Sequence, residues 1–137
     1  MSVLVYTESE QGTFKKTAFE VASYAKAVAN QLGTTVTAVA INANDTPVLG
    51  TYGVDKVLKI TNTQLDNFNA NAYASVIKQA AENESAQVVI VSSSADSKYL
   101  APLLAVELNA GYASNVIEAP SSTSPFTVKR TAFTNKA

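Results

Sequence analysis

The sequence predicts a doubly wound α/β domain built around a mainly parallel sheet. Short apolar or β-branched runs alternate along the chain with longer segments that have helical periodicity. Segments of that length serve as crossover connections, which parallel strands require and which place helices on both faces of a sheet. The clearest βαβ unit begins at Val88–Val91 and ends at Val116–Ile117. We expect the strand order 3-2-1-4-5, with a crevice between the first and fourth strands, where the order reverses.

Five short runs are expected to form this sheet. They are Val3–Tyr6, Thr35–Ile41, Lys56–Ile60, Val88–Val91 and the run that starts at Val116–Ile117. Val88–Val91 is entirely apolar, which is typical of a strand buried on both faces. Lys56–Ile60 is less apolar, which favours a position near an edge. Phe126–Arg130 fits one last short strand.

Helical stripes with three- and four-residue spacing lie between these runs. The first consists of Phe14, Ala18, Val21, Ala25, Val28 and Leu32, and Gly33 follows where a C-terminal glycine cap belongs. The second consists of Tyr73, Val76, Ile77, Ala80 and Ala81, and the third of Leu100, Leu103, Leu104 and Leu108. The polar segments Thr7–Thr13 and Thr61–Asn71 are interpreted as loops, and Pro47–Gly53 as a turn or a single helical turn.

Composition excludes several classes of function. The 137 residues suffice for one domain, and a net charge of −1 offers no basic footprint for nucleic acid or anionic lipid. The chain has no histidine and no cysteine, so imidazole bases, thiol nucleophiles and their zinc sites are ruled out. No signal peptide or membrane-spanning stretch is recognisable, so we expect a cytoplasmic protein without membrane insertion.

Ser92, Ser93 and Ser94 are the first candidate cofactor-binding residues. They follow the fourth strand and precede a helix, and hydroxyl and backbone N–H groups at such a position can bind phosphate. The alternative is that the serines fill a tight turn and cap the helix. No glycine follows to let a phosphate approach the backbone, which favours the turn.

The loop after the first strand lies where a dinucleotide fingerprint belongs. It contains one glycine, Gly12, where three are needed, and Glu8 and Glu10 would repel a pyrophosphate. An acid/base pair of Glu8 and Glu10 is the other chemical interpretation. Carboxylates this close together on a surface loop are usually solvated, and we expect that here.

Four segments, in order, resemble the N-terminal domain of the alpha subunit of electron transfer flavoproteins. They are Ser2–Glu8, Leu49–Leu58, the run Tyr99–Ala105 continued by Leu108–Gly111 and Ser114–Ile117, and Phe126–Ala137. Asn115 stands where that family usually has Asp. The last segment resembles a family strand pair through Arg130 and through Asn135 or its neighbour, and it departs from the Tyr-Ala-Gly core of that pair. The resemblance covers essentially the whole chain.

The resemblance implies an adenine-nucleotide alpha-hydrolase-like, Rossmann-like three-layer fold. It implies an electron-carrier subunit that pairs with a beta subunit and carries electrons on FAD from acyl-CoA and other dehydrogenases to a quinone reductase. Within that subunit it implies that this N-terminal domain is a non-catalytic scaffold and interface. In the family, a C-terminal domain of the alpha subunit holds most of the flavin contacts. The chain ends at Ala137 without a cap or apolar closure, so we expect residues 1–137 to be an N-terminal fragment that binds no FAD alone. Arg130 is a candidate near the flavin domain or the partner.

Two other functions stay open. One is a stand-alone adenine-nucleotide-binding module similar to universal stress proteins, with ATP or AMP at Ser92–Ser94. The other is a small α/β enzyme, which ranks last because the chain offers no histidine, no cysteine and no convincing acidic pair.

Overall fold

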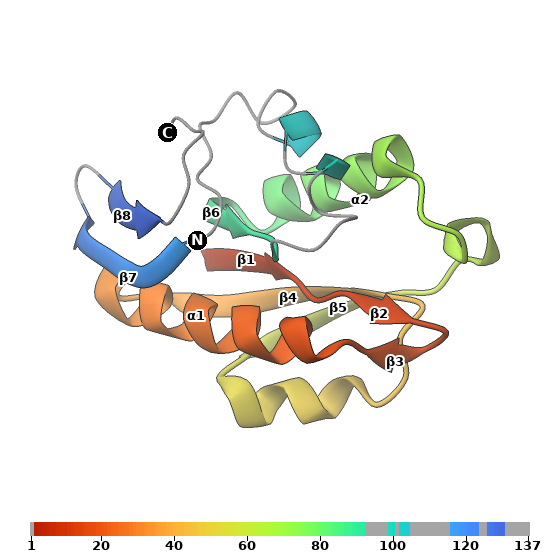
Figure 1. Cartoon of the computed structure of the whole chain (residues 1–137), viewed down its shortest axis with the longest axis horizontal. Coiled ribbons are helices and arrows are strands. Elements are labelled where there is room, and N and C mark those ends of the chain that lie inside the picture. Colours follow the sequence, from red (N-terminus) through yellow and green to blue (C-terminus); the bar gives the residue numbers. More distant parts are fainter. Residues whose placement is uncertain (1, 93–98, 101, 105–115, 124–125, 131–137) are drawn as a thin grey trace.

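A four-stranded parallel sheet forms the centre of the protein (Figure 1). The structure, a computed structural model, describes residues 2–92, 99–100, 102–104, 116–123 and 126–130. The strands are β1 (Ser2–Tyr6), β4 (Thr35–Ile41), β5 (Lys56–Ile60) and β6 (Ala86–Ile90), in the order β5-β4-β1-β6. This order confirms the predicted arrangement of the first four strands and the edge position of the third. With helices on both faces, the fold is a three-layer α/β sandwich of the Rossmann type.

Side chains alternate along β1 and divide the core into two layers. Val3 and Val5 are buried on the face that α1 (Lys16–Leu32) covers, whereas Leu4 and Tyr6 are buried under α2 (Ala70–Asn83) on the opposite face. Both faces of this central strand are therefore sealed from water. On its inner side α1 presents small residues, which allow the helix to approach the sheet closely; they are Ala18, Ala22, Ala25 and Ala29.

The loop predicted at Thr7–Thr13 contains a small hairpin. Strands β2 (Ser9–Glu10) and β3 (Thr13–Phe14) pair antiparallel through a turn at Gln11 and Gly12, both of which have positive φ. Because of this hairpin α1 starts at Lys16, and Phe14 belongs to β3 rather than to the helix. Phe14 is nevertheless buried in the core layer under α1.

The ends of the helices follow the sequence signals. Gly33 closes α1 with φ 68°, and its N–H bonds to carbonyl groups of the last turn, as predicted for a glycine cap. The Asn69 side chain accepts a hydrogen bond from the Ala72 N–H and so caps α2. Short 3₁₀ helices η1 (Thr46–Tyr52) and η2 (Thr63–Leu65) occupy the predicted turn and part of the predicted polar loop.

The third helical stripe is partly described. Residues 99–100 and 102–104 are helical, and Leu100 and Leu104 are buried in the core layer beside α2. Leu108 lies outside the described residues. β6 (Ala86–Ile90) ends one residue before Val91, the end of the predicted strand. Val88, Val89 and Ile90 are partly buried, whereas the sequence predicts a strand buried on both faces.

The prediction that the run starting at Val116–Ile117 forms a fifth strand of the main sheet is wrong. β7 (Val116–Thr123) pairs antiparallel with β8 (Phe126–Arg130) in a separate two-stranded sheet, and β7 lies against α1 (Figure 1). Only a short connection separates these two strands, and such strands pair antiparallel at low entropic cost. None of the helices in the described ranges is long and apolar enough to cross a membrane.

Candidate functional site at the carboxyl ends of β1 and β6

The strand order reverses between β1 and β6, which makes their carboxyl ends the expected ligand position of this fold. From β1 the chain moves outward to β4 and β5, and β6 then returns to the other side of β1. Ligands of open α/β sheets bind in the crevice outside such a switch point. Glu8 follows β1 by two residues and Ser92 follows β6 by two, so both lie at this edge.

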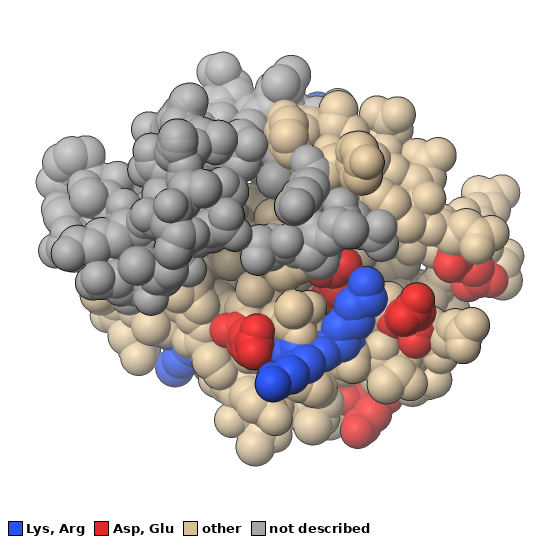
Figure 2. Space-filling view, in the orientation of Figure 1, with Lys and Arg blue, Asp and Glu red and all other residues tan. Residues whose placement is uncertain are grey.

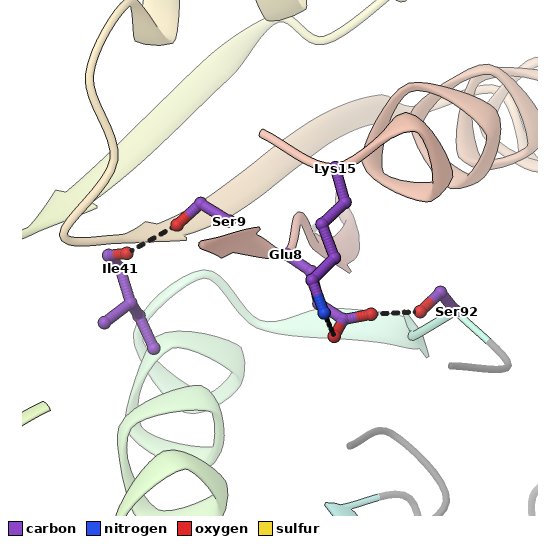
Figure 3. Close-up of polar contacts among 5 residues, drawn as sticks. All are labelled: Glu8, Ser9, Lys15, Ile41 and Ser92. Atoms are coloured by element: carbon purple, nitrogen blue, oxygen red, sulfur yellow. Dashed lines mark hydrogen bonds and ion pairs between the residues drawn. The ribbon is translucent and has the colours of Figure 1, made fainter. Parts of the chain in front are cut away.

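Three residues, Glu8, Lys15 and Ser92, form a polar cluster with Glu8 at its centre (Figure 3). The Ser92 hydroxyl donates a hydrogen bond to Oε1 of Glu8, and the Lys15 ammonium lies 3.5 Å from Oε2. Glu8 is only 2% exposed and Ser92 7% exposed. The expectation that Glu8 is a solvated surface residue is wrong, because the hairpin folds back and turns its side chain inward. Glu10, on β2, is exposed as expected.

Backbone contacts on both sides of Glu8 fix its position. Thr7 extends the pairing of β1, since its N–H and its hydroxyl both donate to the Val39 carbonyl, at 3.0 and 2.9 Å. The Ser9 hydroxyl donates to the Ile41 carbonyl at 3.0 Å (Figure 3), and the Lys15 N–H donates to the Glu8 carbonyl at 3.0 Å. The loop is therefore tied to β4 on one side and to the start of α1 on the other.

The electrostatics of the cluster explain how a carboxylate can be buried here. A buried charge is costly unless hydrogen bonds and an opposite charge compensate for it. Ser92 supplies a donor from β6 and Lys15 supplies a positive charge. Lys15 is also the residue before the first turn of α1, whose N-terminus carries a partial positive charge. The Lys15 side chain is 34% exposed, so the ion pair stays open to water on one side.

These residues do not fit the phosphates of a dinucleotide or of FAD. A nucleotide bound at the switch point needs backbone N–H groups and glycines that leave space for phosphate. Here a carboxylate lies between the ends of β1 and β6 and would repel a phosphate. Gly12 belongs to the hairpin turn, where its carbonyl accepts from the Asn44 N–H at 2.8 Å and a Cβ would lie 2.5 Å from the Asn44 side chain. Among the described residues no group of three His, Cys, Asp or Glu could hold a metal ion.

Sequence reasoning located part of this cluster. It placed Ser92 at the site, but as a phosphate ligand or turn residue, and it left Lys15 out. Ser93 and Ser94 lie outside the described residues. Arg130 is the last residue of β8, paired with Val116 in the separate two-stranded sheet. The signal for Glu8 is its place two residues after the central strand, where neighbouring loops can enclose a side chain.

The surface around the hairpin and α1 carries charges of both signs. Figure 2 shows lysine and carboxylate side chains side by side on this face, without a broad patch of one sign among the described residues. Such a mixed surface lacks the basic stripe that nucleic-acid binding requires. The face in view therefore gives no support to a nucleic-acid partner.

The chain is similar in sequence to a known family and to several named proteins. The family model described as "Electron transfer flavoprotein domain" matches residues 3–137. Protein FixB of Clostridium saccharobutylicum is 29% identical over 111 residues, which are 80% of this chain and 33% of that protein. The electron transfer flavoprotein subunit alpha of Clostridium acetobutylicum is 29% identical over 112 residues, with the same shares of 80% and 33%. The acryloyl-CoA reductase electron transfer subunit beta of Anaerotignum propionicum is 25% identical over 112 residues, 80% of this chain and 30% of that protein.

The chain thus spans about a third of the length of the curated relatives it matches, with 33% of the first two covered. The family match begins within β1, at residue 3, and extends to residue 137. On this evidence of sequence and fold, the chain belongs to the electron transfer flavoprotein domain family.

Proposed function

We propose that this chain is the scaffold and interface domain of an electron transfer flavoprotein alpha subunit. It docks against a beta subunit and positions a separate flavin domain. The assembled protein holds FAD and carries electrons from acyl-CoA and other dehydrogenases to a quinone reductase. The domain itself performs no chemistry and binds no FAD alone, and we expect the complex to work in the cytoplasm.

One observation carries the scaffold assignment. The buried Glu8 carboxylate lies at the switch point, where a nucleotide-binding member of this fold class would hold phosphate. A domain that fills this position with its own side chain is suited to structure rather than to ligand binding. The named relatives support the alpha-subunit assignment, since one of them is an electron transfer flavoprotein subunit alpha. The same observation weighs against the stand-alone nucleotide module.

Gel filtration of the purified chain tests the docking. The chain is run alone and together with the beta subunit of the same complex, with FAD added, and flavin absorbance is recorded across the peaks. We expect co-elution with the beta subunit and no flavin absorbance in the peak of the isolated chain. An unrelated α/β domain of similar mass serves as the control for non-specific association.

The opposite pattern would overturn the proposal. If the folded chain elutes separately from the beta subunit but retains adenine nucleotide, the nucleotide-binding module replaces the scaffold. Far-UV circular dichroism of the same sample establishes that the chain is folded.

A further inference from the structure

We infer that the Glu8 carboxylate is an internal anion that closes a phosphate-binding position of this fold, and that removing it opens a site for inorganic phosphate. The inference shares with the proposed function the observation that Glu8 lies at the switch point, but its test uses the isolated chain and does not involve docking to a beta subunit. Its ligand class is a phosphate group, free or carried by a nucleotide.

Location is the first argument. The carboxyl ends of β1 and β6, at the switch point, are the position where open α/β sheets bind phosphate-bearing ligands. The Glu8 side chain lies at this position, with the end of β6 on one side and the start of α1 on the other (Figure 3). An anion is therefore present at the expected place, but it is covalently part of the chain.

The groups that face the carboxylate are the second argument. A hydroxyl donor and an ammonium group bind Glu8, and these are donors that a phosphate accepts equally well. Ser92 is 7% exposed and comes from a strand end 84 positions away along the chain. Lys15 adjoins the N-terminus of α1, whose dipole favours a negative charge. The surroundings of Glu8 thus form a built anion site rather than a chance surface contact.

Charge balance gives the third argument. With Glu8 in place the cluster already holds one negative charge against the one positive charge of Lys15. A second anion would meet a like charge a few ångströms away, which weakens its binding by at least about tenfold. Replacement of Glu8 by alanine removes that charge, vacates the volume of the carboxylate and leaves the Lys15 charge without its anion.

Phosphate titration of variants tests the inference. Binding of inorganic phosphate to the wild-type chain, Glu8→Ala and Glu10→Ala is measured by isothermal titration calorimetry, with the rise of Tm in phosphate as a second readout. We expect Glu8→Ala to bind phosphate at least about tenfold more tightly than the wild type. Glu10 lies on the same hairpin and is exposed, so Glu10→Ala should behave as the wild type. Adding Ser92→Ala or Lys15→Met to Glu8→Ala should abolish the gain.

Several outcomes would overturn the inference. Phosphate binding of the wild type that equals that of Glu8→Ala would show that Glu8 blocks nothing. Retention of the gain in the Glu8→Ala, Ser92→Ala double variant would place the anion elsewhere. If Glu8→Ala does not fold, Glu8→Ser replaces it, and a folded serine variant without improved phosphate binding would refute the site. None of these results bears on docking to the beta subunit, so a failure here and a failure of the proposed function are distinguishable.

Discussion

The hydrogen bond between Ser92 and Glu8 should contribute more to stability than an ordinary serine hydrogen bond. It joins residues 84 positions apart, both nearly inaccessible to solvent, and its acceptor is a carboxylate. Hydrogen bonds to charged groups contribute about 1.5–3 kcal/mol, compared with about 1 kcal/mol for neutral pairs. The replacement Ser92→Ala also leaves Oε1 of Glu8 without this donor in a buried position. We therefore expect the free energy of unfolding to fall by about 2 kcal/mol.

Ser9→Ala is the matched control. The Ser9 hydroxyl donates to the Ile41 carbonyl at 3.0 Å in a partly buried position, so the same chemical change removes a neutral hydrogen bond. Its expected cost is about 1 kcal/mol or less. Lys15→Met should cost about 1–3 kcal/mol, because it leaves the 2%-exposed Glu8 carboxylate without its cation, and the 34% exposure of the Lys15 side chain keeps the cost below that of a fully buried pair.

Urea unfolding followed by far-UV circular dichroism provides the measurement. The midpoints should shift while the m-value stays constant, because a single hydroxyl does not change the surface exposed on unfolding. A Ser92→Ala cost that is no larger than the Ser9→Ala cost would refute the reasoning, since the carboxylate would then gain nothing special from Ser92.

Three further predictions concern the core, the turns and alkaline pH. Ile77 is a residue of α2 and is fully buried against the sheet, so Ile77→Ala should lower the free energy of unfolding by about 2–5 kcal/mol in urea titrations. Gly12 and Gly33 both have positive φ, but a Cβ at Gly12 would lie 2.5 Å from Nδ2 of Asn44 whereas a Cβ at Gly33 meets nothing within 4 Å. Gly33→Ala should therefore cost about 1 kcal/mol of left-handed strain, and Gly12→Ala clearly more, by the same titrations. Burial raises the pKa of Tyr24 to about 12, so between about pH 10 and that value only the unfolded chain loses the proton, and the free energy of unfolding should fall as pH rises.

Each of these has a result that would contradict it. Equal costs for the two glycine variants would show that Asn44 yields without penalty. Tyr24→Phe cannot ionise at this position, so an alkaline loss of stability that is the same in this variant would not originate from Tyr24. An Ile77→Ala cost near zero would mean that α2 does not seal the sheet as described.

The layers of this fold are predictable from the sequence because the apolar pattern is strong and local. Val3–Tyr6 is apolar throughout, and the structure buries it between α1 and α2. Gly33 likewise ends α1 for a local reason, since its conformation suits glycine. The apolar pattern gives a wrong prediction at Phe14. Its four-residue spacing to Ala18 predicts a helical residue, but Phe14 lies on β3. Strands of two residues have too little alternation to be recognised.

The candidate site is less predictable because its partners come together only in the folded chain. Glu8 has the composition of a solvated loop residue, and its burial depends on the hydroxyl of Ser92 and the ammonium of Lys15. The pairing of β7 with β8 is a similar case. An apolar run can add to the main sheet or pair with a neighbouring strand. The more stable pairing depends on tertiary contacts, which the hydrophobic periodicity of the sequence does not reveal.

The central claim is that this domain is a scaffold whose switch point is closed to nucleotides and flavins. The most direct test is equilibrium dialysis of the folded wild-type chain alone against FAD and, separately, against ATP. A second aliquot of the same preparation is mixed with the beta subunit and shown to co-elute with it. We expect equal concentrations of each ligand on both sides of the dialysis membrane. Retention of either ligand in stoichiometric amount on the chain would contradict it, because Glu8 would then not occupy the place of a phosphate.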